Sequence, residues 1–189
     1  MNTEKLIENL KKRGFEAVFA TSKAEAVEKA LSFMPENSSV SWGGSVSIEE
    51  AGLLERVKSG KYTLIDRDKA KTPEERAEIM RQGLTADIFL TSFNAVSEDG
   101  VLFNIDGNGN RVAAIAFGPK SVIALVGINK IVPTEADLEK RALSVAAPKN
   151  AQRLKLANDQ DICATFVKTR VCRAKGRIKI IVVGEELGY

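Results

Sequence analysis

The first 92 residues alternate short apolar runs, typical of buried strands, with stretches of helical periodicity. We expect strands at residues 16–20, 38–42, 62–65 and 87–91. Between them, Ser22 and Glu25 have the spacing of a helix capping box, residues 48–57 have a helical pattern, and Thr72-Pro73 indicates a helix start. Strands separated by helices need crossover connections. This pattern therefore predicts a mainly parallel sheet, with ligands beyond the carboxyl ends of its strands.

The second part, residues 93–189, has a different rhythm. Strand-like runs at 95–97, 101–106, 111–116 and 122–126 are joined by turn residues, and helical segments at 135–146 and 150–157 precede a last strand at 179–183. No linker divides two cores, and 189 residues suit one ordinary domain. The expected fold is a single-domain, layered α/β structure with a mixed, mainly parallel sheet flanked by helices.

Composition removes several kinds of chemistry. Histidine is absent, which excludes Ser-His-Asp and Cys-His catalysis and every histidine metal site. Cys163 and Cys172 have eight residues between them, a spacing that fits neither a zinc knuckle nor a Cys-x-x-Cys redox pair. We therefore expect no metal and no cofactor. Apolar runs such as 178–183 are too short to span a bilayer and the start lacks a signal-peptide core, so a cytoplasmic protein without a membrane partner is expected.

The net charge is only +3, but it is concentrated near the C-terminus. Residues 162–179 contain Lys168, Arg170, Arg173, Lys175, Arg177 and Lys179 and no acidic residue. This segment is either a solvated basic face or an anion-binding edge. No aromatic residue interleaves the charges from 168 to 179, so nucleic acid is not an expected partner.

A strand, paired glycines and a helix pattern follow one another at residues 38–57. Gly43, Gly44 and Ser45 could let backbone amides approach an anion, or could simply form a tight turn. Glu50 is the candidate catalytic carboxylate, as nucleophile or general base. It also has capping-box spacing from Ser47, so a purely structural role is the alternative.

Three further polar clusters follow predicted strands. Asn94 lies just after the strand at 87–91, either bordering a ligand crevice or stabilising its loop. The glycine-rich turn at 106–111 leads into a predicted strand, which excludes a dinucleotide fingerprint and favours a hairpin turn. Its Arg111 could bind a carboxylate or phosphate. After the strand at 122–126, Lys130 is either an anion partner or a surface charge, the more common place for lysine. The predicted ligand-binding residues of these three clusters are Asn94, Asp106, Gly107, Gly109, Asn110, Arg111, Asn129 and Lys130. We expect them to share one crevice with Gly43, Gly44 and Ser45.

Taken together, these motifs resemble the lactate utilisation protein C family, built on the LUD domain. The resemblance is carried by Trp42-Gly43-Gly44-Ser45 with Glu50 and Gly52, by 87–94, by the specific block 99–112, and by 127–132 and 177–189. It implies a fold similar to the sugar-phosphate isomerase and coenzyme A transferase superfamily. Many similar proteins have a cysteine-rich insertion where this chain passes directly from Asp159-Gln160-Asp161-Ile162 to Cys163. Two cysteines cannot supply the four thiolates of an iron–sulfur cluster.

The resemblance implies a role in L-lactate oxidation to pyruvate, as an accessory or small-anion-binding subunit beside iron–sulfur partner subunits. The alternative is a stand-alone enzyme or binder for a phosphorylated, folate-like or coenzyme A-type anion, with Glu50 in its site. The expected partners are thus a small anionic metabolite, the iron–sulfur subunits and a second copy of the chain in a homo-oligomer. The sequence leaves open whether the chain is itself an enzyme.

Overall fold

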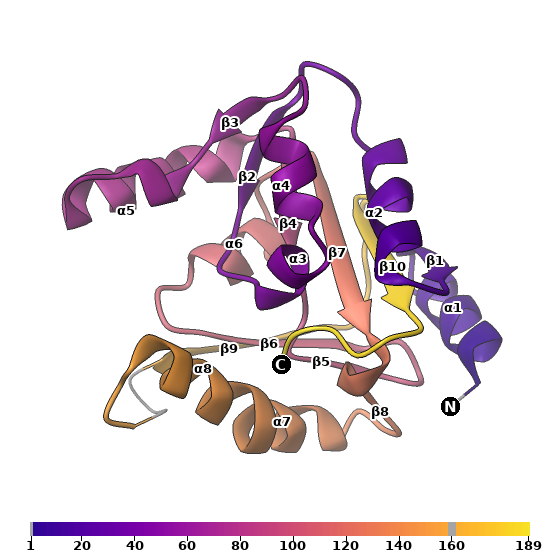
Figure 1. Ribbon diagram of the computed structural model, residues 1–189. Helices are drawn as coiled ribbons and strands as arrows, with labels where there is room; N and C mark the ends of the chain where they lie inside the picture. The colour runs from indigo at the N-terminus through magenta and orange to yellow at the C-terminus, as the bar shows by residue number, and fades with distance from the viewer. Residues whose placement is uncertain (1, 159–161) are drawn as a thin grey trace.

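A computed structural model describes residues 2–158 and 162–189 of the chain (Figure 1). The segment Asp159–Asp161, where the sequence analysis placed the missing cysteine-rich insertion, lies outside the described residues.

The larger of two sheets has six strands, and all of them pair in parallel. Its order is β1-β10-β7-β4-β2-β3. The strands are β1 (Glu16–Ala20), β2 (Ser39–Trp42), β3 (Thr63–Ile65), β4 (Ile88–Thr91), β7 (Ser121–Gly127) and β10 (Ile178–Val183). The central strands β4, β7 and β10 are almost wholly buried, because an apolar cluster packs against each face of the sheet. Their continuous apolar runs are typical of strands covered on both sides.

Helices cover both faces of this sheet (Figure 1). On these faces lie α1 (Thr3–Lys12), α2 (Lys23–Ser32), α3 (Val46–Glu50) and α4 (Leu53–Lys58). By contrast, α5 (Pro73–Gln82) has no buried residue and packs against the 3₁₀ turns Arg67–Lys69 and Gly83–Thr85, so it projects from the sheet. Two predicted helix starts are confirmed, since Ser22 accepts a hydrogen bond from the Glu25 amide and Thr72 accepts one from the Glu75 amide. The single helix predicted at 48–57 is instead two short helices, because Gly52 adopts a left-handed conformation with φ of 78° between them.

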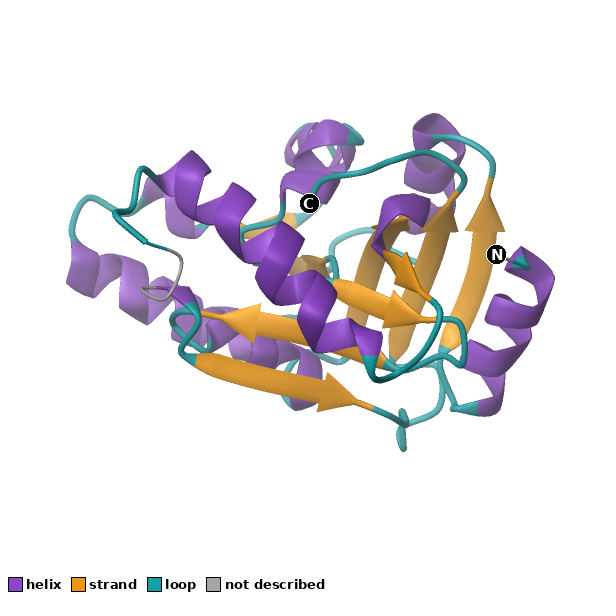
Figure 2. Ribbon diagram, turned by 90° about the horizontal axis from the view of Figure 1, so that it is seen from below, coloured by secondary structure: helices purple, strands orange, loops and turns teal. Residues whose placement is uncertain are grey.

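The second sheet has four strands in the order β8-β5-β6-β9. They are β8 (Ile131–Val132), β5 (Ala95–Ser97), β6 (Leu102–Asp106) and β9 (Thr165–Thr169). Pairs β5–β6 and β6–β9 are antiparallel, and β5–β8 is parallel. Helices α7 (Asp137–Arg141) and α8 (Ala147–Leu154), joined by a π-helical turn at Ala142–Ala146, lie across it (Figure 2). The predicted α/β class with mainly parallel strands is confirmed, but the antiparallel pairs form a sheet of their own.

One predicted strand is wrong. Residues 111–116 form a helix, α6 (Asn110–Ala116), so the turn before it is not a hairpin. The cause is Asp106, whose carboxylate accepts hydrogen bonds from the amides of Asn108, Arg111 and Val112 and so starts the helix. The reason given for excluding a dinucleotide loop, a following strand, is therefore wrong as well. A dinucleotide loop is still excluded, for a different reason: the amides that would bind a phosphate already donate hydrogen bonds to the Asp106 carboxylate.

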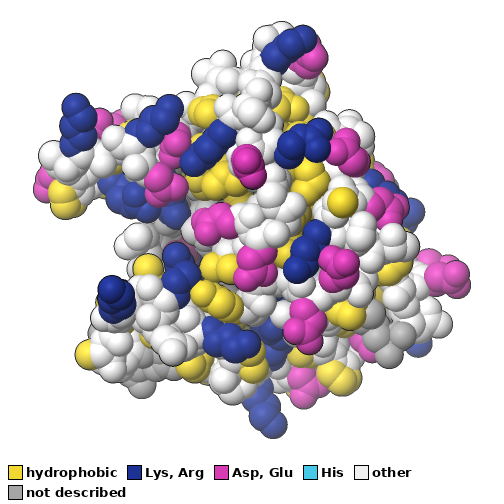
Figure 3. Space-filling model, in the orientation of Figure 1, with side chains coloured by type: hydrophobic (Ala, Val, Ile, Leu, Met, Phe, Trp, Pro, Cys, Tyr) yellow, Lys and Arg dark blue, Asp and Glu magenta, His cyan; other side chains and the backbone are white. Residues whose placement is uncertain are grey.

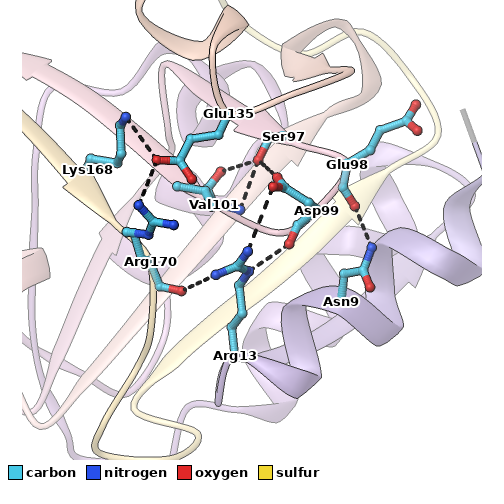
Figure 4. Close-up of polar contacts among 9 residues, drawn as sticks. All are labelled: Asn9, Arg13, Ser97, Glu98, Asp99, Val101, Glu135, Lys168 and Arg170. Carbon is cyan, nitrogen blue, oxygen red and sulfur yellow. Dashed lines mark hydrogen bonds and ion pairs between the residues drawn. The ribbon is translucent and has the colours of Figure 1, made fainter.

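The basic C-terminal segment holds the two sheets and their helices together (Figure 4). Lys168 and Arg170 both pair with Glu135 of the segment before α7, and Arg170 also accepts a hydrogen bond from Arg13 through its carbonyl. Arg13 donates in addition to the carbonyl of Asp99. Further along, the Arg177 guanidinium donates to the carbonyls of Ala114, Ile115 and Pro119. Much of this segment is therefore neither a free solvated face nor an open anion-binding edge. Across the described residues, no helix has the length and apolar character needed to cross a membrane.

Candidate functional site

A cavity of about 370 Å³ opens where the parallel strands end and the second sheet begins. The surface is hollowed between α5 and α8, with basic side chains on both sides of the hollow (Figures 1 and 3). The structure brings most of the predicted ligand-binding residues to this cavity. Those that line it are Gly43, Gly44, Ser45, Asn94, Asp106, Gly107, Asn110, Arg111 and Lys130, while Gly109, Asn129 and Glu50 do not.

Lys130 is buried in the cavity wall, with only 4% of its surface exposed. It belongs to the 3₁₀ turn Ile128–Lys130 that follows the central strand β7. Lys130 is therefore not at the surface, where lysines are more commonly found. Its ammonium donates to the hydroxyls of Ser47, at 2.7 Å, and Ser92, at 3.1 Å. Burial above all, and then the nearby charges of Arg141 and Arg111, lower the Lys130 pKa from 10.5 to about 7, although Glu50 acts in the opposite direction.

Arg111 is the second buried cation of the cavity. Its Nε lies 3.6 Å from a carboxylate oxygen of Asp106, and its guanidinium also donates to the Ile105 carbonyl and to the Asn94 side-chain oxygen. Burial lowers the Arg111 pKa and the Asp106 charge partly restores it. The Asn94 oxygen also accepts from the Ile105 amide, at 2.9 Å, so it serves the loop. The Asn94 amide nitrogen has no partner among the described residues and remains available to a ligand.

The absence of side chains at Gly43 and Gly44 makes room for two arginine side chains. Neither Gly43 nor Gly44 has a positive φ, so a tight turn does not require them. A Cβ on Gly43 would lie 3.1 Å from the Cδ of Arg111, and a Cβ on Gly44 would lie 3.0 Å from a guanidinium nitrogen of Arg67. The two glycines therefore let two arginine side chains pack directly against the backbone beside the cavity.

The sequence analysis missed several residues that matter for this geometry. They are Ser47 and Ser92, which hold Lys130, and Arg67, Arg76 and Arg141 around the cavity. Arg67 follows strand β3, at the same sheet edge as the glycine pair, and this position could have revealed it. Its Nε and the Ser45 hydroxyl are buried without a hydrogen-bond partner among the described residues. Nothing in the sequence marks Arg141, whose helix is brought to the site by tertiary packing.

Glu50 and Asn129 hold the C-terminal segment 184–189 instead of lining the cavity. The Glu50 carboxylate accepts from the Gly188 amide at 2.7 Å, and Asn129 accepts from the Leu187 amide and donates to the Gly188 carbonyl. The alternative interpretation of Ser47 and Glu50 as a capping box is wrong, because α3 starts after Ser45 and Ser47 contacts Lys130 and Leu187. The segment lies close over the site, since a Cβ on Gly188 would meet the Ser47 hydroxyl at 2.4 Å.

The donor set of the cavity is suited to anions and unsuited to metals. Five basic side chains line it, from Arg67, Arg76, Arg111, Lys130 and Arg153, against three acidic ones, from Glu49, Asp68 and Asp106. Within residues 2–158 and 162–189, no three His, Cys, Asp or Glu side chains are grouped as a metal site requires.

Comparison with known proteins identifies the family of this domain. The LUD domain family model matches residues 3–183. The chain belongs to the LUD-domain family. Segments of two proteins named lactate utilization protein B are similar to it. The one from Anoxybacillus flavithermus (strain DSM 21510 / WK1) is 39% identical over 79 residues, and the one from Shouchella clausii (strain KSM-K16) is 35% identical over 77 residues. Each match covers 38% of this chain and 16% of the relative, so the chain spans only a small part of those proteins.

A solved structure shares the fold of this LUD domain. It is a DUF162 family protein from Deinococcus radiodurans, with a TM-score of 0.60 and 14% sequence identity over 96% of this chain and 95% of that one. At this identity the likeness concerns the fold alone.

Proposed function

We propose that this LUD domain binds a small carboxylate metabolite as part of a lactate oxidation system. The observation that carries the proposal is the environment of Lys130. This lysine is buried in the wall of the cavity, and no carboxylate of the described residues forms a direct ion pair with it. Burying a charge without a partner is costly, and a bound anion removes that cost. The names of the similar proteins, both lactate utilization protein B, support lactate or pyruvate as the first ligands to test.

The same proposal assigns the electron-transfer step to other proteins. Oxidation of lactate to pyruvate releases two electrons, and the two cysteines of this chain cannot form a four-thiolate iron–sulfur cluster. We therefore propose that the domain acts beside iron–sulfur partner subunits and supplies the anion site.

A larger, phosphorylated or coenzyme A-type anion is the second candidate, because the cavity has room for it. Lactate has about six non-hydrogen atoms, and if each takes no more volume than a water molecule, ~30 Å³, the ligand occupies less than ~200 Å³. The cavity volume is about 370 Å³. Arg67 and Arg76 also line the cavity and could meet a second anionic group. Competition between such an anion and lactate would separate the two candidates.

Calorimetric titration with L-lactate and pyruvate tests the proposal. Binding should be lost, or weakened at least ~10-fold, in Lys130→Met, because methionine keeps the shape of the side chain but not its charge. Lys5→Met, at an exposed position on α1, is the matched control and should bind as the wild type does. An anion favours the charged lysine, so apparent affinity for lactate should fall above pH 7, where the free Lys130 loses its proton. Equal binding by both variants would contradict the proposal.

A further inference from the structure

We propose that Lys130 captures 2-oxo acids covalently, as an imine between its amine and the keto carbon of the ligand. The inference rests on the proposed carboxylate site and extends it. It makes the site selective for a 2-oxo acid such as pyruvate over the corresponding 2-hydroxy acid, because only the former has a carbonyl group.

The surroundings of Lys130 suit a nucleophilic amine. Its Nζ is held by two neutral hydroxyls, those of Ser47 and Ser92, so forming the neutral amine breaks no ion pair with a described carboxylate. The charged groups that influence it are the cations Arg111 and Arg141 and the anion Glu50. Burial and neighbouring cations both favour the neutral, reactive form of a lysine, and they lower the Lys130 pKa to about 7. Two of the three ammonium protons are engaged, and the third has no partner among the described residues.

The cavity also supplies what a 2-oxo acid needs beside the amine. The Arg111 guanidinium, anchored by Asp106, can hold the ligand carboxylate, and the Asn94 amide nitrogen can donate to it as well. Carboxylate and keto carbon are adjacent atoms in such a ligand. Lys130 and Arg111 line the same cavity, and the Arg111 charge is one of those that act on Lys130, so the proposal assigns the carboxylate to the arginine and the adjacent keto carbon to the amine.

The two hydroxyls have unequal roles in the reaction. Ser92 donates to the Leu125 carbonyl at 2.7 Å and thereby anchors Lys130 to strand β7. Ser47 donates to the Leu187 carbonyl at the longer distance of 3.3 Å, and it is closer to the amine. Ser47 can therefore turn its proton toward the reacting atoms, and it is the positioning and proton-transfer residue of the proposal.

The step balances without an oxidant or reductant. The lone pair of neutral Lys130 attacks the keto carbon, a C–N bond forms, and the carbonyl oxygen takes a proton from the Ser47 hydroxyl. The amine nitrogen then returns a proton to Ser47. Loss of the second amine proton and departure of the former carbonyl oxygen as water leave a C=N bond, so amine and ketone give imine and water. The bond is reversible and is trapped by an added hydride donor.

Borohydride reduction tests the inference on the full chain. Pyruvate with sodium borohydride should add one reduced pyruvate adduct per chain, and peptide mass spectrometry should place it on Lys130, with the other lysines as internal controls. L-lactate with borohydride should give no adduct. The yield should rise as pH passes through about 7, where the amine becomes neutral, although lactate affinity falls over the same interval. Ser47→Ala should slow trapping at least ~10-fold, and Ser47→Thr, which keeps a hydroxyl, should restore most of the trapping rate.

The outcomes separate this inference from the proposed function. Lys130→Arg keeps the cation but cannot form the imine, so it should bind pyruvate without any adduct. Wild-type protein that binds pyruvate and yields no adduct on Lys130, or one spread over several lysines, overturns the imine and leaves the carboxylate site standing. Wild-type protein that binds neither acid overturns the proposed function itself.

Discussion

Replacing Lys130 by methionine should stabilise the protein and remove a specific pH dependence from its free energy of unfolding. The Lys130 pKa is about 7 in the folded chain, against 10.5 for a solvated lysine. Each pKa unit corresponds to about 1.4 kcal/mol, so the cost of burying this charge is on the order of 5 kcal/mol at pH 6. Methionine avoids that cost but loses two hydrogen bonds, each of roughly 1 kcal/mol. The expected net gain at pH 6 is therefore about 3 kcal/mol.

The sign of the pH dependence follows from proton counting. Between pH 7 and about 10.5 the unfolded chain keeps the Lys130 proton and the folded chain has lost it. The unfolded state thus binds more protons, so wild-type stability should rise with pH over this interval, by up to about 1.4 kcal/mol per pH unit. Below pH 7 both states are protonated and this group adds no slope. The stabilising effect of Lys130→Met should accordingly be largest at pH 6 and should shrink steadily above pH 7.

Urea unfolding of wild type, Lys130→Met and the control Lys5→Met at half-unit steps from pH 6 to 9.5 measures these differences. Comparing the wild type with a single variant cancels the contribution of every other group that titrates in the range. Parallel pH profiles for wild type and Lys130→Met would refute the reasoning, because they would mean that the lysine is as solvated in the folded chain as in the unfolded one.

Three further predictions concern residues around this site and the fold that holds it. Asp106→Asn should lower the free energy of unfolding by roughly 1–3 kcal/mol, because one of its charged oxygens starts α6 and lies near Arg111; an unchanged urea midpoint would contradict that role. Glu50→Gln keeps an acceptor for the Gly188 amide, so stability at pH 6 should change by less than ~0.5 kcal/mol, whereas loss of the nearby negative charge should lower the Lys130 pKa further and move the trapping profile to lower pH. Gly14→Ala should cost more than ~1 kcal/mol in thermal unfolding, since φ is +84° there and the new Cβ would lie 2.4 Å from the Cys172 carbonyl; a change within error would show that the loop at Cys172 yields freely.

Local pattern alone determined most elements of the parallel half, although it merged α3 and α4 into one helix. Apolar runs bounded by capping residues and glycine predicted strands β1 to β4 and the starts of α2 and α5, because these signals act within a few residues. The same reading placed Gly43, Asn94, Arg111 and Lys130 after strands. Parallel strands end at one edge, so the meeting of Gly43, Asn94 and Lys130 followed from the order of elements, whereas Arg111 follows a strand of the second sheet and reaches the cavity through tertiary packing.

The tertiary structure decided the properties that depend on contacts between residues far apart in the sequence. Residues 111–116 read as a strand because their apolar content suits either element. The Asp106 carboxylate starts the helix from five residues away, and the buried side chains of Ala114 and Ile115 then pack it into an apolar cluster of the large sheet. Glu50 has capping-box spacing, yet it binds the Gly188 amide from the far end of the chain. The state of Lys130 is the clearest case. Burial and the charges of Arg111 and Arg141 set its pKa, and both come from segments whose positions no local pattern specifies, because a desolvation cost exists only once the chain has closed around the group.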